Sequence, residues 1–273
     1  MTAIAERIAE RIAGRSLVRD GLALGGIAFV VTIYVSCFVF AKPGYIGSDL
    51  ALYQREVQAW LGGAPMYPPS EVAGPFTIVS GVILYPPITI LLFLPTLLLP
   101  LPLWWLIPAA IIGTVVYRLR PGGWWLLAIG LCLLYPQSVT MVVDGNPGMW
   151  LAAALAVSVY WRPAAAFVLL KPSVFPLALI GLRSRGWWAI AGLFALVSLA
   201  FLPQTLDWLA VIRNGQGGSL LGGPMYSLGD LPLLAVPLLA WAGSTRAAPD
   251  GATLLAGLRR DRRRPAAQGP GRG

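Results

Sequence analysis

Long apolar stretches separated by short polar segments dominate the pattern of this chain. Runs of roughly 14 to 20 apolar residues predict helices that cross a lipid bilayer, because about 20 such residues span its hydrocarbon core and local thinning accommodates shorter ones. The pattern predicts six full transmembrane helices, at residues 21–40, 102–118, 123–142, 148–161, 187–203 and 229–243. The expected fold class is therefore all-α, a polytopic membrane protein.

Two further apolar stretches, 84–99 and 163–182, are interrupted by prolines. In the second, Lys171 precedes Pro172, and a proline disfavours helical geometry in the residue before it and has no amide to donate. We expect both stretches to be re-entrant or half-crossing. Non-helical backbone at membrane depth is tolerated only where it is buried in protein or lines a polar cavity, so the breaks indicate a site.

The segment 1–20 carries isoleucine at every fourth residue between charged residues, which predicts an amphipathic helix on the cytoplasmic membrane face. The first span is interpreted as a retained helix, because the basic segment before it is long for a signal peptide. The polar loop 42–82 is then extracytoplasmic. Within it, Ser48-Asp49 opens and Gly62-Gly63 ends a predicted amphipathic helix on the outer membrane surface. Its apolar face comprises Tyr53, Val57, Trp60 and Leu61.

Composition supports the membrane interpretation, with 57% hydrophobic and 11% charged residues and a mean hydropathy of +0.73. The net charge of +9 comes from arginines in short clusters between apolar stretches, which is typical of positive-inside topology and not of nucleic-acid binding. With two half-crossing segments, every arginine cluster between spans falls on the cytoplasmic side. We expect a transmembrane domain at 21–243, followed by a disordered basic cytoplasmic tail at 244–273.

The chain contains no histidine, which removes histidine-based triads and the usual zinc sites, so a general base would be a carboxylate. Cys37 and Cys132 lie in apolar stretches, where free cysteines act as small packing residues. The topology gathers one polar set on the extracytoplasmic face, which predicts a site there. Its members are Asp49, Glu56, Glu71, Asp144, Asn146, Lys171, Asp207, Arg213 and Asp230.

Three of these positions have both a structural and a chemical interpretation. Asp49 either caps the surface helix or serves as a general base at the membrane boundary. The turn Asp144-Gly145-Asn146-Pro147 either caps the next helix or contributes to the site. Lys171 is a cation inside an apolar run and requires an anion, for which a phosphate is the natural partner. The pairs Trp104-Trp105, Trp124-Trp125 and Trp187-Trp188 are expected to be interfacial anchors.

Taken in order, several motifs resemble the polyprenol-phosphate-mannose-dependent mannosyltransferases of glycosyltransferase family 87, which have the GT-C architecture. The similarity covers about residues 45–190. It rests on Ser48-Asp49-Leu50 with Tyr53, Ala59-Trp60-Leu61-Gly62-Gly63-Ala64-Pro65-Met66-Tyr67, Leu84-Tyr85-Pro86-Pro87, Gly145-Asn146, Leu170-Lys171-Pro172 and Arg183-Ser184-Arg185-Gly186-Trp187-Trp188.

The resemblance implies an inverting transfer of a hexose, mannose in this family, from a polyprenyl-phosphate donor to an envelope glycolipid or glycan acceptor. The enzyme would lie in the plasma membrane, with its N-terminus cytoplasmic and its active site extracytoplasmic. Asp49 matches the catalytic base and Lys171 the lysine near the lipid phosphate. Substrate contacts are expected from Asp144, Asn146, Tyr53 and Tyr85. No cofactor is required, and a divalent metal bridging Asp49 and Asp144 stays an open alternative.

Two other functions fit the same pattern. Broken helices around a buried charge also describe transporters of lipid phosphates or small solutes, although the two halves of this chain show no inverted repeat. Family members are usually longer than 273 residues. An inactive, shortened member acting as a partner subunit is the third possibility.

Overall fold

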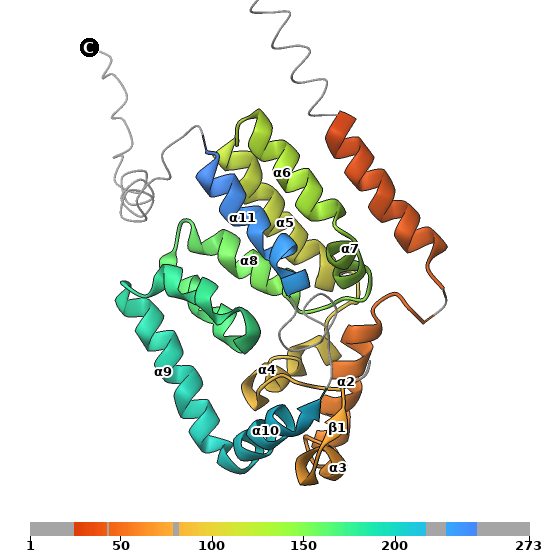
Figure 1. The fold of residues 1–273 in the computed structure, drawn as a ribbon, viewed down its shortest axis with the longest axis vertical. Helices are drawn as coiled ribbons and strands as arrows, with labels where there is room; N and C mark the ends of the chain where they lie inside the picture. Colours follow the sequence, from red (N-terminus) through yellow and green to blue (C-terminus); the bar gives the residue numbers. More distant parts are fainter. Residues whose placement is uncertain (1–24, 43, 79–81, 217–227, 245–273) are drawn as a thin grey trace, which may run out of the picture.

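The computed structural model describes residues 25–42, 44–78, 82–216 and 228–244, and these residues are mostly helical (Figure 1). The all-α prediction is confirmed. The predicted N-terminal helix at 1–20 lies outside the described residues, as does the predicted tail apart from Ser244, which forms an isolated bridge with Pro121.

A first helix, Gly25–Phe40, precedes the labelled elements, and the first of these lie in and after the polar loop. They are α2 (Ser48–Leu61), α3 (Pro69–Ala73), strand β1 (Phe76–Thr77), α4 (Pro87–Leu91) and the 3-10 helix η1 (Leu94–Leu97). The bundle helices follow as α5 (Leu103–Leu119), α6 (Gly123–Leu134), α7 (Pro136–Val143) and α8 (Gly148–Ser158). The remaining elements are η2 (Arg162–Leu170), η3 (Pro172–Gly181), α9 (Arg185–Ala200), α10 (Leu202–Asn214), β2 (Gly215–Gln216), η4 (Leu228–Asp230) and α11 (Leu231–Ala242).

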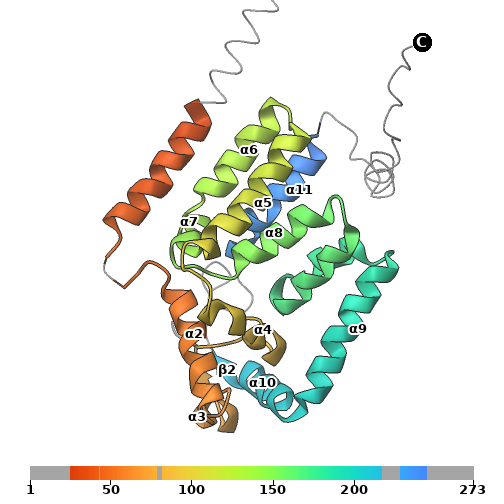
Figure 2. The same ribbon diagram turned by 180° about the vertical axis from the view of Figure 1, so that it is seen from behind.

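The described residues form three hydrophobic clusters, the largest of which packs η2, η3 and α9 with α8. Helices α5, α6, α8 and α11 form a bundle, in which α8 contacts both α5 and α11 and its small residues, such as Ala152 and Ala156, are fully buried (Figure 1). Small side chains let helix backbones approach closely, which is typical of helices packed within membranes. Helices α2 and α4 lie below the bundle (Figure 2). Together with η1 and the start of α5 they contribute to an aromatic core that includes Tyr53, Phe93 and Trp104.

None of the helices in the described part of the chain is long and apolar enough by itself to cross a bilayer. Two bent pairs meet the length and composition of a span when taken together: α6 with α7, which bend by 59°, and α9 with α10, which bend by 96°. The α6–α7 break falls at Pro136, where the missing amide removes a helical hydrogen bond. The six predicted full spans therefore stay a prediction.

Both predicted half-crossing stretches are broken in the structure. Residues 84–99 contain only the short helices α4 and η1, and residues 163–182 contain two 3-10 helices that meet at Lys171. The backbone of Lys171 is extended, with φ −122° and ψ 92°, as expected for a residue before proline. The prediction of a break at the buried cation is confirmed.

The predicted surface helix is α2. Tyr53 and Val57 lie on its buried face, as expected, and Leu50 lies there too. Leu61 does not, because 59% of its surface is exposed. At its C-terminal end Gly63 adopts φ +92°, and the amides of Gly63 and Ala64 bond to the carbonyl oxygens of Trp60 and Ala59. This is the Schellman arrangement that the glycine pair predicts.

Candidate functional site

The turn between α7 and α8, residues 144–147, is the centre of the candidate site. Helix α7 ends with the amides of Gly145 and Asn146 bonded to the carbonyl oxygens of Val142 and Met141, which is a second Schellman motif. Gly145 takes φ +72°, a conformation that glycine adopts without steric cost. The predicted turn is confirmed, and its physical basis is the glycine.

The start of α2 is bonded directly to this turn. The amide of Gly47 donates to the carbonyl of Val143 and the amide of Asp49 to that of Asp144, both at 2.9 Å. A side chain at Gly145 would lie 3.3 Å from the Cβ atom of Leu50 and 3.3 Å from the Trp105 ring. Glycine is therefore needed at position 145 for close packing as well as for backbone conformation.

Two tryptophans fix the turn from the side of α5. The indole nitrogen of Trp104 donates to the carbonyl of Gly145 at 2.8 Å, and that of Trp105 donates to the carbonyl of Val142 at 2.6 Å. The expectation that this pair anchors the protein at the membrane interface is wrong for Trp104, which is buried. Trp187 is also buried and donates to the carbonyl of Ala178. Trp124 is 83% exposed, so its anchoring role stays a prediction.

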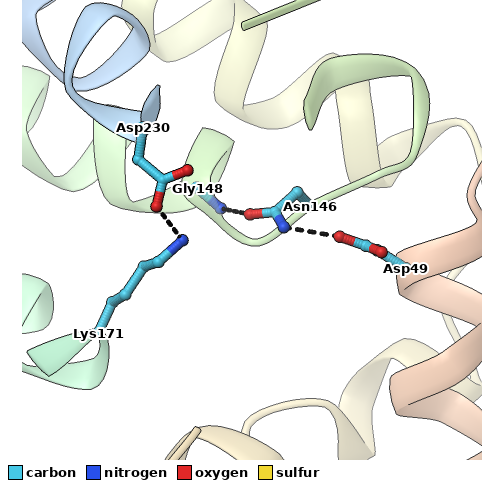
Figure 3. Close-up of polar contacts among 5 residues, drawn as sticks. All are labelled: Asp49, Asn146, Gly148, Lys171 and Asp230. Carbon is cyan, nitrogen blue, oxygen red and sulfur yellow. Dashed lines mark hydrogen bonds and ion pairs between the residues drawn. The ribbon is translucent and has the colours of Figure 1, made fainter. Parts of the chain in front are cut away.

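Asn146 connects the two sides of the site. Its amide nitrogen donates a 2.6 Å hydrogen bond to the carboxylate of Asp49, and its carbonyl oxygen accepts one of 2.9 Å from the amide of Gly148 (Figure 3). The second bond caps the start of α8, one of the two interpretations of the turn. The first orients Asp49 across the turn. Asp49 does not cap α2, which begins after Gly47 without a side-chain cap, but it lies in the first turn, where a carboxylate is favourable near the helix dipole.

The surroundings of Asp49 and Asp144 raise the pKa of both carboxyl groups. Burial raises the pKa of Asp49, and the hydrogen bond from Asn146 and the charge of Lys171 oppose that rise. Burial, then the neighbouring Asp49 charge, raise the pKa of Asp144 to about 6, against a hydrogen bond from Tyr45. One Asp144 oxygen, Oδ1, is buried without a hydrogen-bond partner among the described residues. A base with a raised pKa is better matched to proton transfer near neutral pH.

Lys171 lies on the other side of the site, where η2 meets η3. Its ammonium is 2.5 Å from the carboxylate of Asp230, and both side chains are over 90% buried (Figure 3). The ammonium is also 5.7 Å from the centre of the Tyr85 ring. The carbonyl of Leu170 accepts a hydrogen bond from Thr89, which attaches α4 to the broken segment. The anion that a buried lysine requires is thus Asp230 in this structure.

Asp230 belonged to the predicted polar set but was not among the expected site residues. It ends η4 and immediately precedes α11, so its sequence surroundings are those of an ordinary helix start. The feature of the sequence that could have indicated Asp230 is the requirement of Lys171 for an anion. That requirement alone could not select Asp230 from several carboxylates predicted on the same face.

The two expected tyrosines pack on each other between Asp49 and Lys171. The rings of Tyr53 and Tyr85 meet edge to face with centres 5.5 Å apart, and Tyr53 stacks on Phe93 at 4.5 Å. The hydroxyl of Tyr85 is buried beside that of Tyr53, and its proton has no acceptor in the described part of the structure. Tyr85 thus has an unused donor in the same region as the Lys171 ammonium.

All six residues expected from the sequence thus lie around one region of the structure. The carboxylate of Asp49 and the ammonium of Lys171 extend toward each other from opposite sides of the turn that carries Asn146 (Figure 3). The Lys171 charge influences Asp49, consistent with a shared polar region. Across the described ranges, no group of three or more His, Cys, Asp or Glu side chains could hold a metal ion. A metal at Asp49 and Asp144 would have two protein carboxylates only.

Comparison with known protein families, with curated proteins and with solved structures finds no match to this chain in any of the three.

Proposed function

We propose that this protein is a membrane glycosyltransferase that moves a hexose, mannose in the first instance, from a polyprenyl-phosphate donor to a glycolipid or glycan acceptor in the cell envelope. The proposal places the protein in the plasma membrane with its site on the extracytoplasmic side. The observation that carries it is the juxtaposition of Asp49 and Lys171 around one polar region, on opposite sides of the Asn146 turn.

Glycosyl transfer from a lipid phosphate needs two groups, and the site supplies both. In the proposed step Asp49 takes the proton of the acceptor hydroxyl as that oxygen forms a bond to the anomeric carbon. The bond from this carbon to the phosphate oxygen breaks, and its electron pair leaves with the polyprenyl phosphate. Lys171 stabilises the negative charge that develops there. Displacement from the opposite face inverts the anomeric configuration.

The hydrogen bond from Asn146 supports this role for Asp49. A base must be held within reach of the proton it abstracts, and the Asn146 amide holds one carboxylate oxygen of Asp49. Burial raises the pKa of Asp49 and this hydrogen bond opposes the rise. Asn146 is accordingly a positioning residue for the base.

The experiment that tests the proposal is transfer from a panel of polyprenyl-phosphate sugars by the purified protein, scored as released polyprenyl phosphate. The Asp49→Asn variant should lose transfer by about a hundredfold or more, the lower end of the usual contribution of a general base. Glu56→Gln, on the same helix, should retain it. An Asp49→Asn variant with full activity, or no release from any donor by the native protein, would contradict the proposal.

A lipid-phosphate or solute transporter is the second candidate, because the buried Lys171–Asp230 pair lies where a helix is broken, as substrate sites in transporters do. Uptake of a labelled lipid phosphate or solute by proteoliposomes, without cleavage of any sugar donor, would favour it over the transferase.

A further inference from the structure

We propose that Asp230 is a displaceable counter-ion, which neutralises Lys171 in the unliganded protein and gives up that position when the phosphate of the donor binds. This inference rests on the proposed function, because it assumes that an anionic phosphate is the ligand of Lys171. It adds a residue that controls which anions the site accepts.

The burial of the ion pair is the first step of the argument. Lys171 and Asp230 side chains are 9% and 8% exposed, and their charged atoms are 2.5 Å apart. A buried ammonium without a partner is strongly destabilising, so Lys171 needs an anion from the protein itself whenever no anionic ligand is bound. A phosphate bound to the same ammonium would lie within a few ångströms of the carboxylate. Like charges at that separation repel strongly in a buried site, so one anion excludes the other.

The start of α11 offers the Asp230 carboxylate an alternative to its contact with Lys171. Asp230 is the N-cap residue of α11, yet its carboxylate makes no capping hydrogen bond in this structure. Aspartate is among the best N-cap residues, because its side chain accepts a hydrogen bond from an amide in the first turn. The second residue of the helix is Pro232, which has no amide hydrogen, so the capping hydrogen bond would be donated by the amide of Leu233 to the Asp230 carboxylate. The backbone of Asp230 is helical here (φ −76°, ψ −23°), so capping by the released carboxylate in the proposed exchange also requires this backbone to become extended.

Tyr85 provides an independent indication that an anion binds beside Lys171. Its hydroxyl is buried beside that of Tyr53, its proton has no acceptor among the residues described, and the Lys171 ammonium lies 5.7 Å from its ring centre. An unpaired buried polar group is costly, and a ligand that pairs with it recovers that cost. A phosphate presents several acceptor oxygens, so in the proposed complex it bonds to Lys171 and Tyr85 together, whereas Asp230 contacts Lys171 in this structure.

The exchange makes Asp230 a specificity-determining residue. A carboxylate ligand would bind weakly, because it would replace the carboxylate of Asp230, which makes the same interaction with Lys171 and is covalently held in place. A phosphate also accepts a hydrogen bond from Tyr85, and its binding frees the Asp230 carboxylate to cap α11. The site therefore selects phosphate over weaker anions by competition.

The test is binding of farnesyl phosphate, a short polyprenyl phosphate, to the detergent-solubilised full chain, measured by calorimetry with acetate and farnesol as comparison ligands. Asp230→Asn should bind farnesyl phosphate at least about tenfold more tightly than the native protein, because no carboxylate has to be displaced. It should also gain measurable affinity for acetate. Asp230→Ser, which keeps a good N-cap residue, should behave in the same way if the asparagine variant fails to fold.

Three controls decide the outcome. Asp207→Asn, the same substitution on α10, should leave affinity unchanged. Lys171→Met should lose binding, and Tyr85→Phe should weaken it several-fold. Native-like or weaker binding in folded Asp230→Asn and Asp230→Ser would overturn the inference while leaving the transferase intact. If the native protein and every variant fail to bind farnesyl phosphate, the proposed function fails, and the inference fails with it.

Discussion

Asn146 donates a 2.6 Å hydrogen bond to the carboxylate of Asp49 across 97 positions of sequence. The same side chain accepts a hydrogen bond from the amide of Gly148, so the cap of α8 and the orientation of the candidate base depend on one residue. Four predictions follow from the contacts around this pair.

Replacing Asn146 with alanine should reduce sugar transfer at neutral pH by about tenfold, the rate equivalent of losing a hydrogen bond to a charged group. The bond from Asn146 lowers the pKa of Asp49, so its loss raises that pKa further. Asp49 then stays protonated to a higher pH, and the acidic limb of the pH–rate profile moves upward. The profile of Gln54→Ala, which removes an amide on the same helix bonded to Thr96, should not move. Superimposable profiles for Asn146→Ala and the native protein would contradict this role.

Replacing Asp144 with asparagine should stabilise the protein at pH 7.5 and leave its stability unchanged near pH 4. The folded protein raises the pKa of Asp144 from 3.8 to about 6. Folding therefore favours the protonated form, and the stability that it contributes is present below pH 4 and lost as pH rises through 6. Because Asp144 is half-exposed, we expect a gain of only a few degrees in melting temperature. Equal gains at both pH values would show that charge is not the cause.

Replacing Trp104 with phenylalanine should destabilise the fold by about 1 to 3 kcal/mol, because the buried carbonyl of Gly145 loses its indole donor. Transfer should also fall, since that carbonyl belongs to the turn that orients Asp49. Trp124→Phe is the matched control, because Trp124 is 83% exposed. Thermal unfolding of the two variants side by side measures the difference. Equal melting temperatures would mean that the indole bond contributes nothing.

Replacing Gly145 with alanine should be more damaging than the same change at Gly63. Both glycines end a helix in a Schellman motif with positive φ, +72° and +92°, so both substitutions carry a backbone cost of about 1 kcal/mol. Only at Gly145 would the new methyl group meet neighbours within 3.4 Å, among them Leu50 in the turn of α2 that carries Asp49. No atom lies within 4 Å of the corresponding position at Gly63.

Melting temperature and transfer rate should therefore separate the two glycine variants. Gly63→Ala should lose a little stability and keep its rate, whereas Gly145→Ala should lose both. Parallel losses in the two variants would show that backbone strain alone explains the effect and that close packing at Gly145 is unimportant.

Local features of the site could be predicted because they depend on residues adjacent in sequence. Pro172 forces the extended backbone of Lys171, and glycine permits the left-handed turn at position 145 whatever surrounds it. The surface helix was predicted with its buried positions 53 and 57 and its terminating glycine pair, because period and capping chemistry are also local. Leu61 was misplaced because the last turn extends beyond the contacts that bury the rest of the helix.

The partner of each polar group was decided by tertiary structure. A buried lysine predicts an anion, but Asp230 became that anion because packing of the bundle brings the start of α11 to the break at Lys171. Trp104 is one of a pair of tryptophans of the kind expected to be interfacial anchors, yet the packing of α5 against α8 buries it beside the turn. The sequence by itself determined where the backbone bends and where charge requires compensation. The identity of the side chains that compensate each charge depends on contacts between segments distant in sequence. These contacts exist only once the helices have packed.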